Sequence, residues 1–294
     1  MKKQSLISQT ILITIFIILC ALVIIPFVML VSVSVSNEQD IAEFGYSVLP
    51  KRIDFSAYEY VFKNPKSILD AYKVTIVYSV VHTVLAVLLQ ALMAYPLTKT
   101  YLRGRNVMTF YLYFTTLFSG GLVPTYILLT QYLHLNNTIW IYILPGLIAP
   151  WNIFMMRTMF KEVPNEICES MLIDGANEYN IFFKTILPLS KPVIATVALN
   201  TFLADWNNWY TSMLYIDKEE LVSLQYLLQR IMQNIQLLQN NNTMDTSMML
   251  SASEIPSETV RMAMAVVVAG PALVIFPFFQ KYFVKGLTVG SVKG

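Results

Sequence analysis

The chain has 294 residues, of which 56% are hydrophobic and only 13% are charged. Soluble globular proteins carry about 25% charged residues, so this chain has too few to cover a compact surface facing water. Its 20 basic and 18 acidic residues leave a formal net charge of +2, which gives no electrostatic basis for binding nucleic acid. The composition therefore excludes a soluble domain and indicates a protein embedded in a lipid bilayer.

Six apolar runs are long enough to cross a bilayer, which takes about 20 residues of helix. They cover residues 11–31, 74–97, 107–133, 139–160, 188–210 and 262–283. Because a helix satisfies its own backbone polar groups in hydrocarbon, we predict an all-α integral membrane fold with six transmembrane helices. Gly120 and Gly121 lie inside the third run, where two small residues predict a bend or a close helix contact.

Basic residues set the orientation, because they gather near helix ends on the cytoplasmic side of a membrane protein. With a cytoplasmic N-terminus, the inner segments contain Lys2, Lys3, Lys99, Arg103, Arg105, Arg157, Lys161, Lys184, Lys191, Lys281, Lys285 and Lys293. The other basic residues fall in two long outer segments, to which the rule applies weakly. We therefore predict a multi-pass protein with both termini in the cytoplasm.

The spans divide the chain into three parts. Residues 1–36 form an N-terminal transmembrane helix, and residues 37–73 mix aromatic with charged side chains. That mixture is typical of short amphipathic helices, here on the outer membrane face. Residues 74–294 form a core of five transmembrane helices, with a cytoplasmic loop at 161–188 and an outer loop at 211–257.

Catalytic chemistry is not evident in the sequence. The chain has two histidines, and no cluster of His, Cys, Asp or Glu has the spacing of a metal site, so we predict neither catalytic residues nor a metal. His82 and Asp205 are the main ionisable groups in the apolar runs, although an ion-driven carrier would need several buried carboxylates. An ion-coupled secondary transporter stays as the alternative function, and a membrane enzyme lacks its catalytic groups.

The cytoplasmic loop predicts a helix–turn–helix. Pro164 suits the first turn of a helix, and the glutamates that follow it suit the positive end of the helix dipole. Gly175 provides a turn with positive φ, after which a second short helix starts near Ala176. Its apolar side chains should be exposed and should bind a protein partner: Tyr179, Phe182 and Phe183.

The same loop resembles a known family. Glu169-Ser170-Met171, then Gly175 and Leu187-Pro188, have the spacing of the EAA loop found in permease subunits of ABC importers. The longer pattern is similar to the carbohydrate, maltose-type class: Ile173-Asp174-Gly175-Ala176, Phe182 and Leu187-Pro188-Leu189. Residues 118–126 are similar to a sub-branch associated with larger or modified oligosaccharides, and residues 280–294 match the usual ending of the class.

Two departures from the family pattern lie in this loop. Ser170 and Met171 replace two alanines, and Thr185 replaces an isoleucine. They change packing volume, which puts the fit with a given ATPase in doubt, but the glycine turn and the Leu-Pro exit are kept.

The resemblance implies a type I importer fold and a role without catalysis. In such importers two permeases pair, and each docks its loop into one of two ATP-binding subunits. The partner subunits bind ATP and magnesium, so this chain would bind no cofactor, and an extracellular sugar-binding protein delivers the sugar. The resemblance also implies a bacterial cytoplasmic membrane and a coupling set of Glu169, Asp174, Gly175, Ala176, Phe182, Leu187 and Pro188. The outer loop at 211–257 would meet the binding protein.

A sugar path is suggested at the outer end of the fifth run. Trp206, Asn207 and Trp209 offer aromatic faces and amides, which suit the C–H face and the hydroxyl groups of a pyranose. Tryptophan also gathers at membrane interfaces without any ligand, so both interpretations stay open. His82 either lines the path or forms a hydrogen bond between helices.

Overall fold

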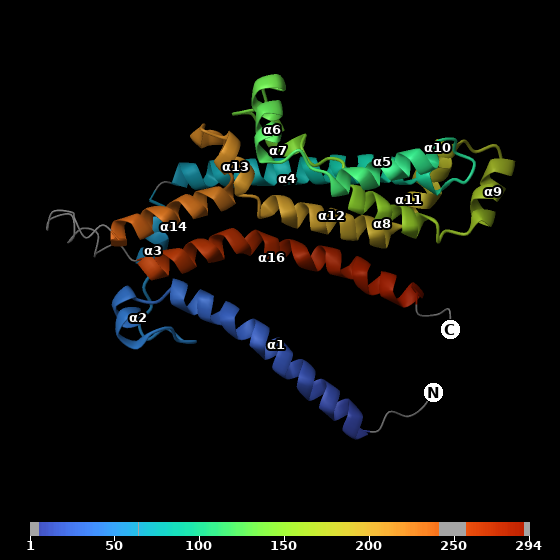
Figure 1. Ribbon diagram of the computed structural model, residues 1–294. Helices are drawn as coiled ribbons and strands as arrows, with labels where there is room; N and C mark the ends of the chain where they lie inside the picture. Colours follow the sequence, from blue (N-terminus) through green and yellow to red (C-terminus); the bar gives the residue numbers. More distant parts are fainter. Residues whose placement is uncertain (1–5, 64, 241–256, 291–294) are drawn as a thin grey trace. The chain divides into compact units, whose positions relative to one another are not determined.

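The computed structural model describes residues 6–63, 65–240 and 257–290. Within these ranges the regular structure is helical, apart from one isolated antiparallel bridge between Ser36 and Ile53 (Figure 1). The all-α prediction is confirmed. Contacts divide the chain into two units, which are described separately: Met1–Ile68 with Leu228–Pro271, and Leu69–Leu227 with Ala272–Gly294.

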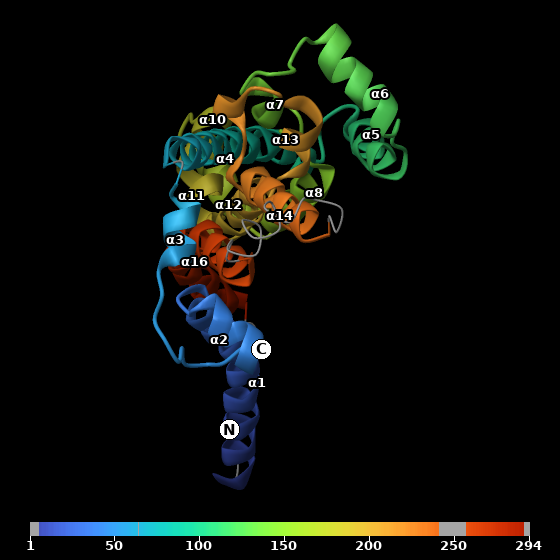
Figure 2. The ribbon, with the colours of Figure 1, turned by 90° about the vertical axis from the view of Figure 1, so that its left-hand side faces the viewer.

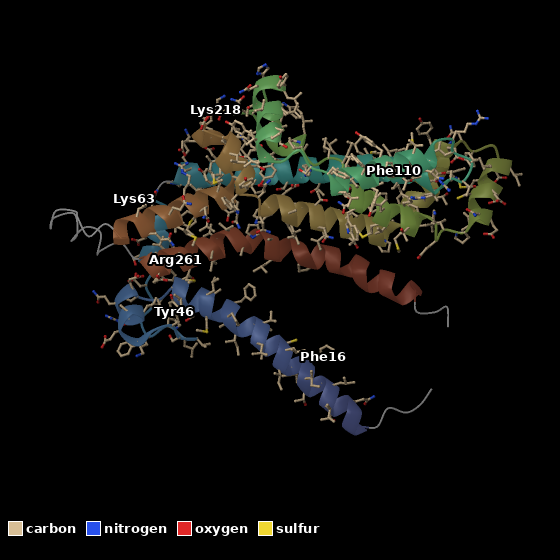
Figure 3. The ribbon with its side chains drawn as sticks, in the orientation of Figure 1. Phe16, Tyr46, Lys63, Phe110, Lys218 and Arg261 are labelled. Carbon is tan, nitrogen blue, oxygen red and sulfur yellow. The ribbon has the colours of Figure 1, made fainter. Side chains whose placement is uncertain are left out.

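The first unit contains α1, two short helices and parts of two long ones. Its helices are α1 (Leu6–Ser34), α2 (Glu38–Phe44), α3 (Ser56–Val61), most of α14 (Leu224–Asn240) and the first part of α16 (Ser257–Gly290). α1 carries large apolar side chains that the chain leaves uncovered, such as Phe16, which is 63% exposed (Figure 3). By length and composition α1 is a candidate membrane span, in agreement with the first predicted run.

Polar contacts hold the segment after α1 in place. The Oδ1 atom of Asn37 accepts a hydrogen bond from the backbone N of Gln39 at 3.0 Å and so caps α2, while Nδ2 donates to Asp54 at 2.8 Å. Arg52 donates to both carboxylate oxygens of Asp40, and this bonding lowers the pKa of Asp40. Short helices predicted within residues 37–73 are therefore present as α2 and α3, although the next helix, α4, starts at Pro65 instead of residue 74.

The second unit is built on α4 (Pro65–Ala94), α8 (Pro150–Phe160) and α12 (Lys191–Trp206), which pack together in both views (Figures 1 and 2). Around them lie η1 (Pro96–Thr98), α5 (Arg105–Leu117), α6 (Leu122–Ile127), η2 (Leu128–Tyr132), α7 (Trp140–Ile143), α9 (Asn165–Ile173), α10 (Glu178–Ile181), η3 (Phe182–Ile186), α11 (Leu187–Leu189), α13 (Tyr210–Tyr215) and η4 (Glu219–Leu221).

The third predicted span is bent where the sequence indicated. The direction of the chain bends by 110° between Arg105–Leu117 and Leu122–Tyr132, and the break contains both small residues, Gly120 and Gly121. Gly121 has φ +86, which lies in a region that residues with a side chain rarely adopt. The glycines therefore allow a turn much sharper than a gentle bend.

The fourth predicted span is not one helix, so the prediction of a continuous helix over 139–160 is wrong. α7 ends at Ile143 and α8 starts at Pro150. Pro145 lacks the backbone N–H that a helix needs, and Gly146 has φ +86. Hydropathy alone rated this run as a span because these two breakers are themselves uncharged.

The number of membrane helices follows from how bent pairs are counted. Among the described residues, three helices are long and apolar enough to cross alone, and the count rises to five if each bent pair is one span. The second bent pair joins Glu178–Leu189 to Lys191–Trp206 at 79°. The count of six stays a prediction.

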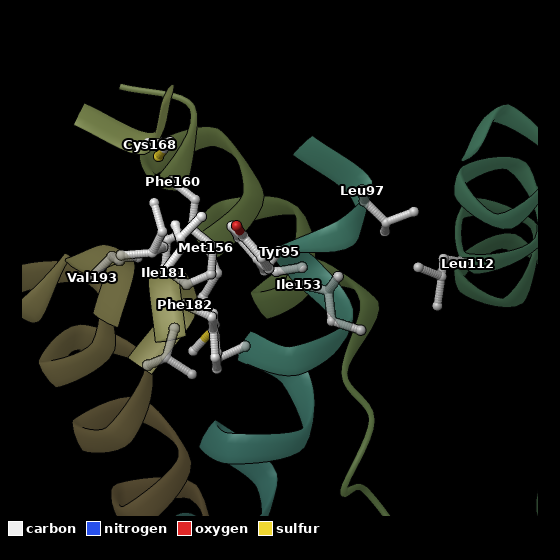
Figure 4. Packing of buried hydrophobic residues seen from close by; sticks show 14 residues of the cluster. Tyr95, Leu97, Leu112, Ile153, Met156, Phe160, Cys168, Ile181, Phe182 and Val193 are labelled. Atoms are coloured by element: carbon white, nitrogen blue, oxygen red, sulfur yellow. The ribbon is translucent and has the colours of Figure 1, made fainter. Parts of the chain in front are cut away.

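Two apolar clusters lie at the two ends of the α4 segment in the second unit. One surrounds Tyr78 and Tyr142, whose rings stack with centroids 4.5 Å apart. The other joins the C-terminal end of α4 to α8, α9, α10 and α12, and its residues include Tyr95, Met156, Phe160, Phe182 and Val193 (Figure 4). The predicted cytoplasmic loop therefore shares a core with the helices beside it.

A capping contact in the first unit gives a test of the fold. The carboxylate of Glu38 accepts hydrogen bonds from the backbone N–H groups of Glu258 and Thr259 at 3.0 Å, in the first turn of α16. We expect Glu38→Ala to lower the free energy of unfolding by about 1–2 kcal/mol, because these donors lose their acceptor. Thermal unfolding of the purified protein measures the change, with the exposed Glu43→Ala on α2 as the control. Equal midpoints for both variants would contradict the capping role.

Candidate coupling segment and membrane path

The coupling segment, residues 161–188, folds as the predicted helix–turn–helix. α9 ends in a motif in which the backbone N–H of Ala176 bonds to the carbonyl of Met171 at 2.9 Å, and that of Gly175 to Leu172 at 3.0 Å. This termination requires a left-handed residue, and Gly175 has φ +81. The side chain of Asn177 then caps α10 by accepting a bond from the backbone N of Asn180. The sequence therefore specifies both the stop and the restart.

Phe182 is not exposed, so that part of the predicted aromatic patch is wrong. The side chain is 2% exposed and packs against Tyr95, with ring centroids 5.2 Å apart, and against Phe160 at 6.4 Å. Burial here follows from position, because a short π-helical stretch (η3) carries Phe182 toward the end of α4. Tyr179 and Phe183 are exposed as predicted, at 72% and 48%.

The remaining residues of the predicted coupling set lie at the surface or just beneath it. Glu169, Asp174, Gly175 and Pro188 are exposed, whereas Ala176 and Leu187 are half-buried against the core cluster. Beside them, α9 exposes Leu172 and Ile173, the latter at 87%. The segment thus has an outward face of carboxylates and aliphatic side chains, and an inward face fixed to α4, α8 and α12.

The two departures from the family pattern meet in space. The hydroxyl of Thr185 donates to the sulfur of Met171 at 2.8 Å, across the turn between α9 and η3. Met171, which is longer than the alanine of the family pattern, therefore contacts Thr185, which is more polar than the isoleucine of that pattern. No spacing argument joined these residues, because they belong to different helical elements.

Of the four residues proposed to line the path, His82 forms a bond between helices. Its Nδ1 lies 2.7 Å from Oδ2 of Asp205, which joins α4 to α12, and both side chains are buried. Trp206 is also buried, at 2%, with its ring 5.8 Å from that of Phe202. Asn207 is exposed and Trp209 is 36% exposed, so the structure separates two buried residues from two at the surface.

Further polar side chains of α4 bond to backbone carbonyls, one on α12 and one at the break in the fourth span. Tyr78 donates to the carbonyl of Asp205 at 2.6 Å, and Gln90 donates to the carbonyl of Leu147 at 2.9 Å. A Cβ at Gly146 would lie 3.6 Å from Nε2 of His82. Tyr78, His82 and Gln90 fall on one helix face, a four-residue spacing that the sequence contained and that could have found them.

Comparisons with known proteins give the class of this chain. Residues 2–289 match the family described as the binding-protein-dependent transport system inner membrane component, and the chain belongs to that family. It is a membrane component of a transport system, and the family is one of transport permeases.

Similar proteins and one solved structure agree with this family assignment. The chain is 36% identical to Protein LplC of Bacillus subtilis (strain 168), across 93% of this chain and 90% of that protein. It is 35% identical to the polygalacturonan/rhamnogalacturonan transport system permease protein YtcP of the same organism, across 95% and 96%. A chain from the crystal structure of a bacterial ABC transporter involved in the import of the acidic polysaccharide alginate is 27% identical, with a TM-score of 0.79 and coverage of 96% and 100%. The family that the sequence resemblance indicated is therefore confirmed for the chain as a whole.

Gly175 gives a test of the turn. A Cβ at this position would meet nothing within 4 Å, so a side chain costs backbone strain and no clash. We expect Gly175→Val to lower the free energy of unfolding by about 1–2 kcal/mol, and Gly175→Asn to cost less because asparagine tolerates left-handed φ. Thermal unfolding measures both. If both variants lose the same free energy of unfolding, the cost does not arise from the positive φ at residue 175.

Asp205 gives a test of the buried pair. We expect Asp205→Ala to lower the free energy of unfolding by about 1–3 kcal/mol, because it leaves His82 buried without its partner. Asp205→Asn keeps a polar group beside Nδ1 and should cost less. Unfolding midpoints in detergent separate the two variants, and a midpoint for Asp205→Ala equal to that of the unchanged protein would show that the pair adds no stability.

Proposed function

We propose that this chain is the membrane-spanning subunit of an ATP-driven, binding-protein-dependent importer of sugars or oligosaccharides. The observation that carries the proposal is full-length similarity to permeases whose names specify such cargo, YtcP for polygalacturonan/rhamnogalacturonan and AraQ of Bacillus subtilis for arabinooligosaccharides. ATP hydrolysis takes place in partner subunits, and ATP and magnesium bind there, so this chain is not an enzyme and holds no cofactor.

The working assembly contains a second homologous permease, two ATP-binding subunits and an extracellular sugar-binding protein. The chain lies in the bacterial cytoplasmic membrane with both termini in the cytoplasm, which the distribution of lysine and arginine supports. The three-part division at 1–36, 37–73 and 74–294 follows from the same orientation. The outer loop at 211–257 meets the binding protein, and its residues 241–256 lie outside the described residues.

The coupling segment transmits the ATP-driven motion. Its exposed face, with Glu169, Asp174 and Gly175, docks on an ATP-binding subunit. Phe182 and Leu187 belong to its inward face, which packs with α4, α8 and α12. When the ATP-binding subunits close, the segment therefore moves together with these helices, and the path changes from inward-open to outward-open. Ala176 and Pro188 fix the two ends of the second half of the segment.

Sugar contacts are proposed at the outer end of α12. Asn207 and Trp209 present an amide and an aromatic face at the surface, the two features that a sugar needs. His82 and Trp206 are buried, and we assign them to the wall behind the path.

Uptake by the assembled importer tests the proposal. The tagged chain should purify with a second permease and two copies of an ATP-binding subunit, and oligosaccharide uptake should stop when ATP is removed. Uptake that continues without ATP would instead support the ion-coupled carrier. Oligogalacturonides and arabino-oligosaccharides serve as the probes, because the names of the two relatives specify polygalacturonan/rhamnogalacturonan and arabinooligosaccharides.

Gly175→Val tests the coupling segment itself. We expect it to reduce sugar-stimulated ATP hydrolysis or to loosen the ATP-binding subunits, because valine at the positive φ of residue 175 would strain the turn between α9 and α10. Unchanged sugar-stimulated hydrolysis in this variant would contradict the coupling role.

A further inference from the structure

Glu178, the first residue of α10, collects three contacts from a single short stretch of chain. The hydroxyl of Tyr95 donates to Oε2, the hydroxyl of Tyr101 donates to Oε1 at 2.5 Å, and Nζ of Lys99 lies 3.3 Å from Oε2. Lys99 also lies over the ring of Tyr95, 4.7 Å from its centroid. All three partners lie at or just after the end of α4, so one carboxylate joins the second half of the coupling segment to that helix.

The hydrogen bonds to Glu178 are of a strong kind, because their acceptor is charged. A carboxylate that accepts from hydroxyl and ammonium donors forms charge-assisted bonds, which are about twice as strong as neutral ones. The hydrogen bond to Glu178 raises the pKa of the Tyr101 hydroxyl to about 12. The side chain of Lys99 is 18% exposed and that of Glu178 is 41% exposed, which places the ion pair partly out of water.

The position of the cluster gives it a mechanical role. Beside it, the ring of Phe182, the first residue of η3, packs on Tyr95, so an apolar contact from η3 and the charged contacts from α10 meet at the residue that follows α4. Farther along the same helix, His82 bonds to Asp205 on α12. A displacement of α10 therefore reaches α4 at its end and passes along it to α12. Glu169, on α9, is exposed and lies outside this cluster.

We propose that Glu178 is a positioning residue that couples the motion of α10 to α4 during transport. The proposal rests on the proposed function, because it presumes that ATP-binding subunits move the coupling segment. It differs from that function in naming a polar link, set by Tyr95, Lys99 and Tyr101, in addition to the apolar core.

The experiment uses the complete importer in proteoliposomes and measures oligosaccharide uptake and ATP hydrolysis together. We expect Glu178→Ala to lower the sugar moved per ATP roughly 5–10-fold, within the range of typical coupling energies. Glu178→Gln keeps an acceptor for the tyrosines and should fall between the unchanged protein and Glu178→Ala. The double variant Tyr95→Phe with Tyr101→Phe should resemble Glu178→Ala, and Glu59→Gln, an exposed glutamate on α3, is the matched control.

A structural role alone predicts a different result. If Glu178 merely stabilised the fold, the amount of assembled complex would fall, and uptake and hydrolysis would fall in parallel with an unchanged ratio. That outcome overturns the proposal, as does full uptake with an unchanged ratio in Glu178→Ala.

A second measurement needs no sugar. Hydrogen exchange of residues 95–104 in the complete importer should change when ATP binds, and that change should be lost in Glu178→Ala and kept in Glu59→Gln. If the change survives in Glu178→Ala, the inference is wrong even where uptake is seen. If no oligosaccharide is taken up while the exchange result holds, the sugar substrate of the proposed function is wrong and the link is supported.

Discussion

Hydrocarbon offers no hydrogen-bond partner, so each backbone N–H and C=O at membrane depth must be satisfied within the protein. Continuous helices meet this constraint by themselves, as α1 and α4 do. The break between α7 and α8 does not, and a side chain from α4 satisfies one backbone group there: Gln90 donates to the carbonyl of Leu147. His82, on the same face of α4, lies close to Gly146. Because the face that holds the break also bonds to Asp205 on α12, irregular backbone and helix packing are fixed by the same residues.

The coupling segment shows how a loop is made rigid without being long. A glycine turn ends α9, an asparagine side chain begins α10, and an apolar core fixes the stretch that follows. Since the inward face packs with α4, α8 and α12, the orientation of the outward face relative to these helices is fixed. Local backbone rules therefore shape the segment, and tertiary packing orients it.

Several features were predictable because they depend on local chemistry. The helix–turn–helix follows from Gly175, and the sharp turn at 118–121 follows from Gly120 and Gly121. The break in the fourth span was missed because hydropathy does not register Pro145 and Gly146 as helix breakers. The burial of Phe182 depends on which helices lie beside η3, and no spacing in the sequence contains that information.

The contact between Thr185 and Met171 has a consequence for how the coupling segment can change. The two residues belong to different helical elements, and both are half-buried, so they pack against each other beneath the outward face. A mutation at either position alone would leave a mismatched pair. The two positions are then expected to change together over evolution, and a loop transplanted between permeases would have to include both.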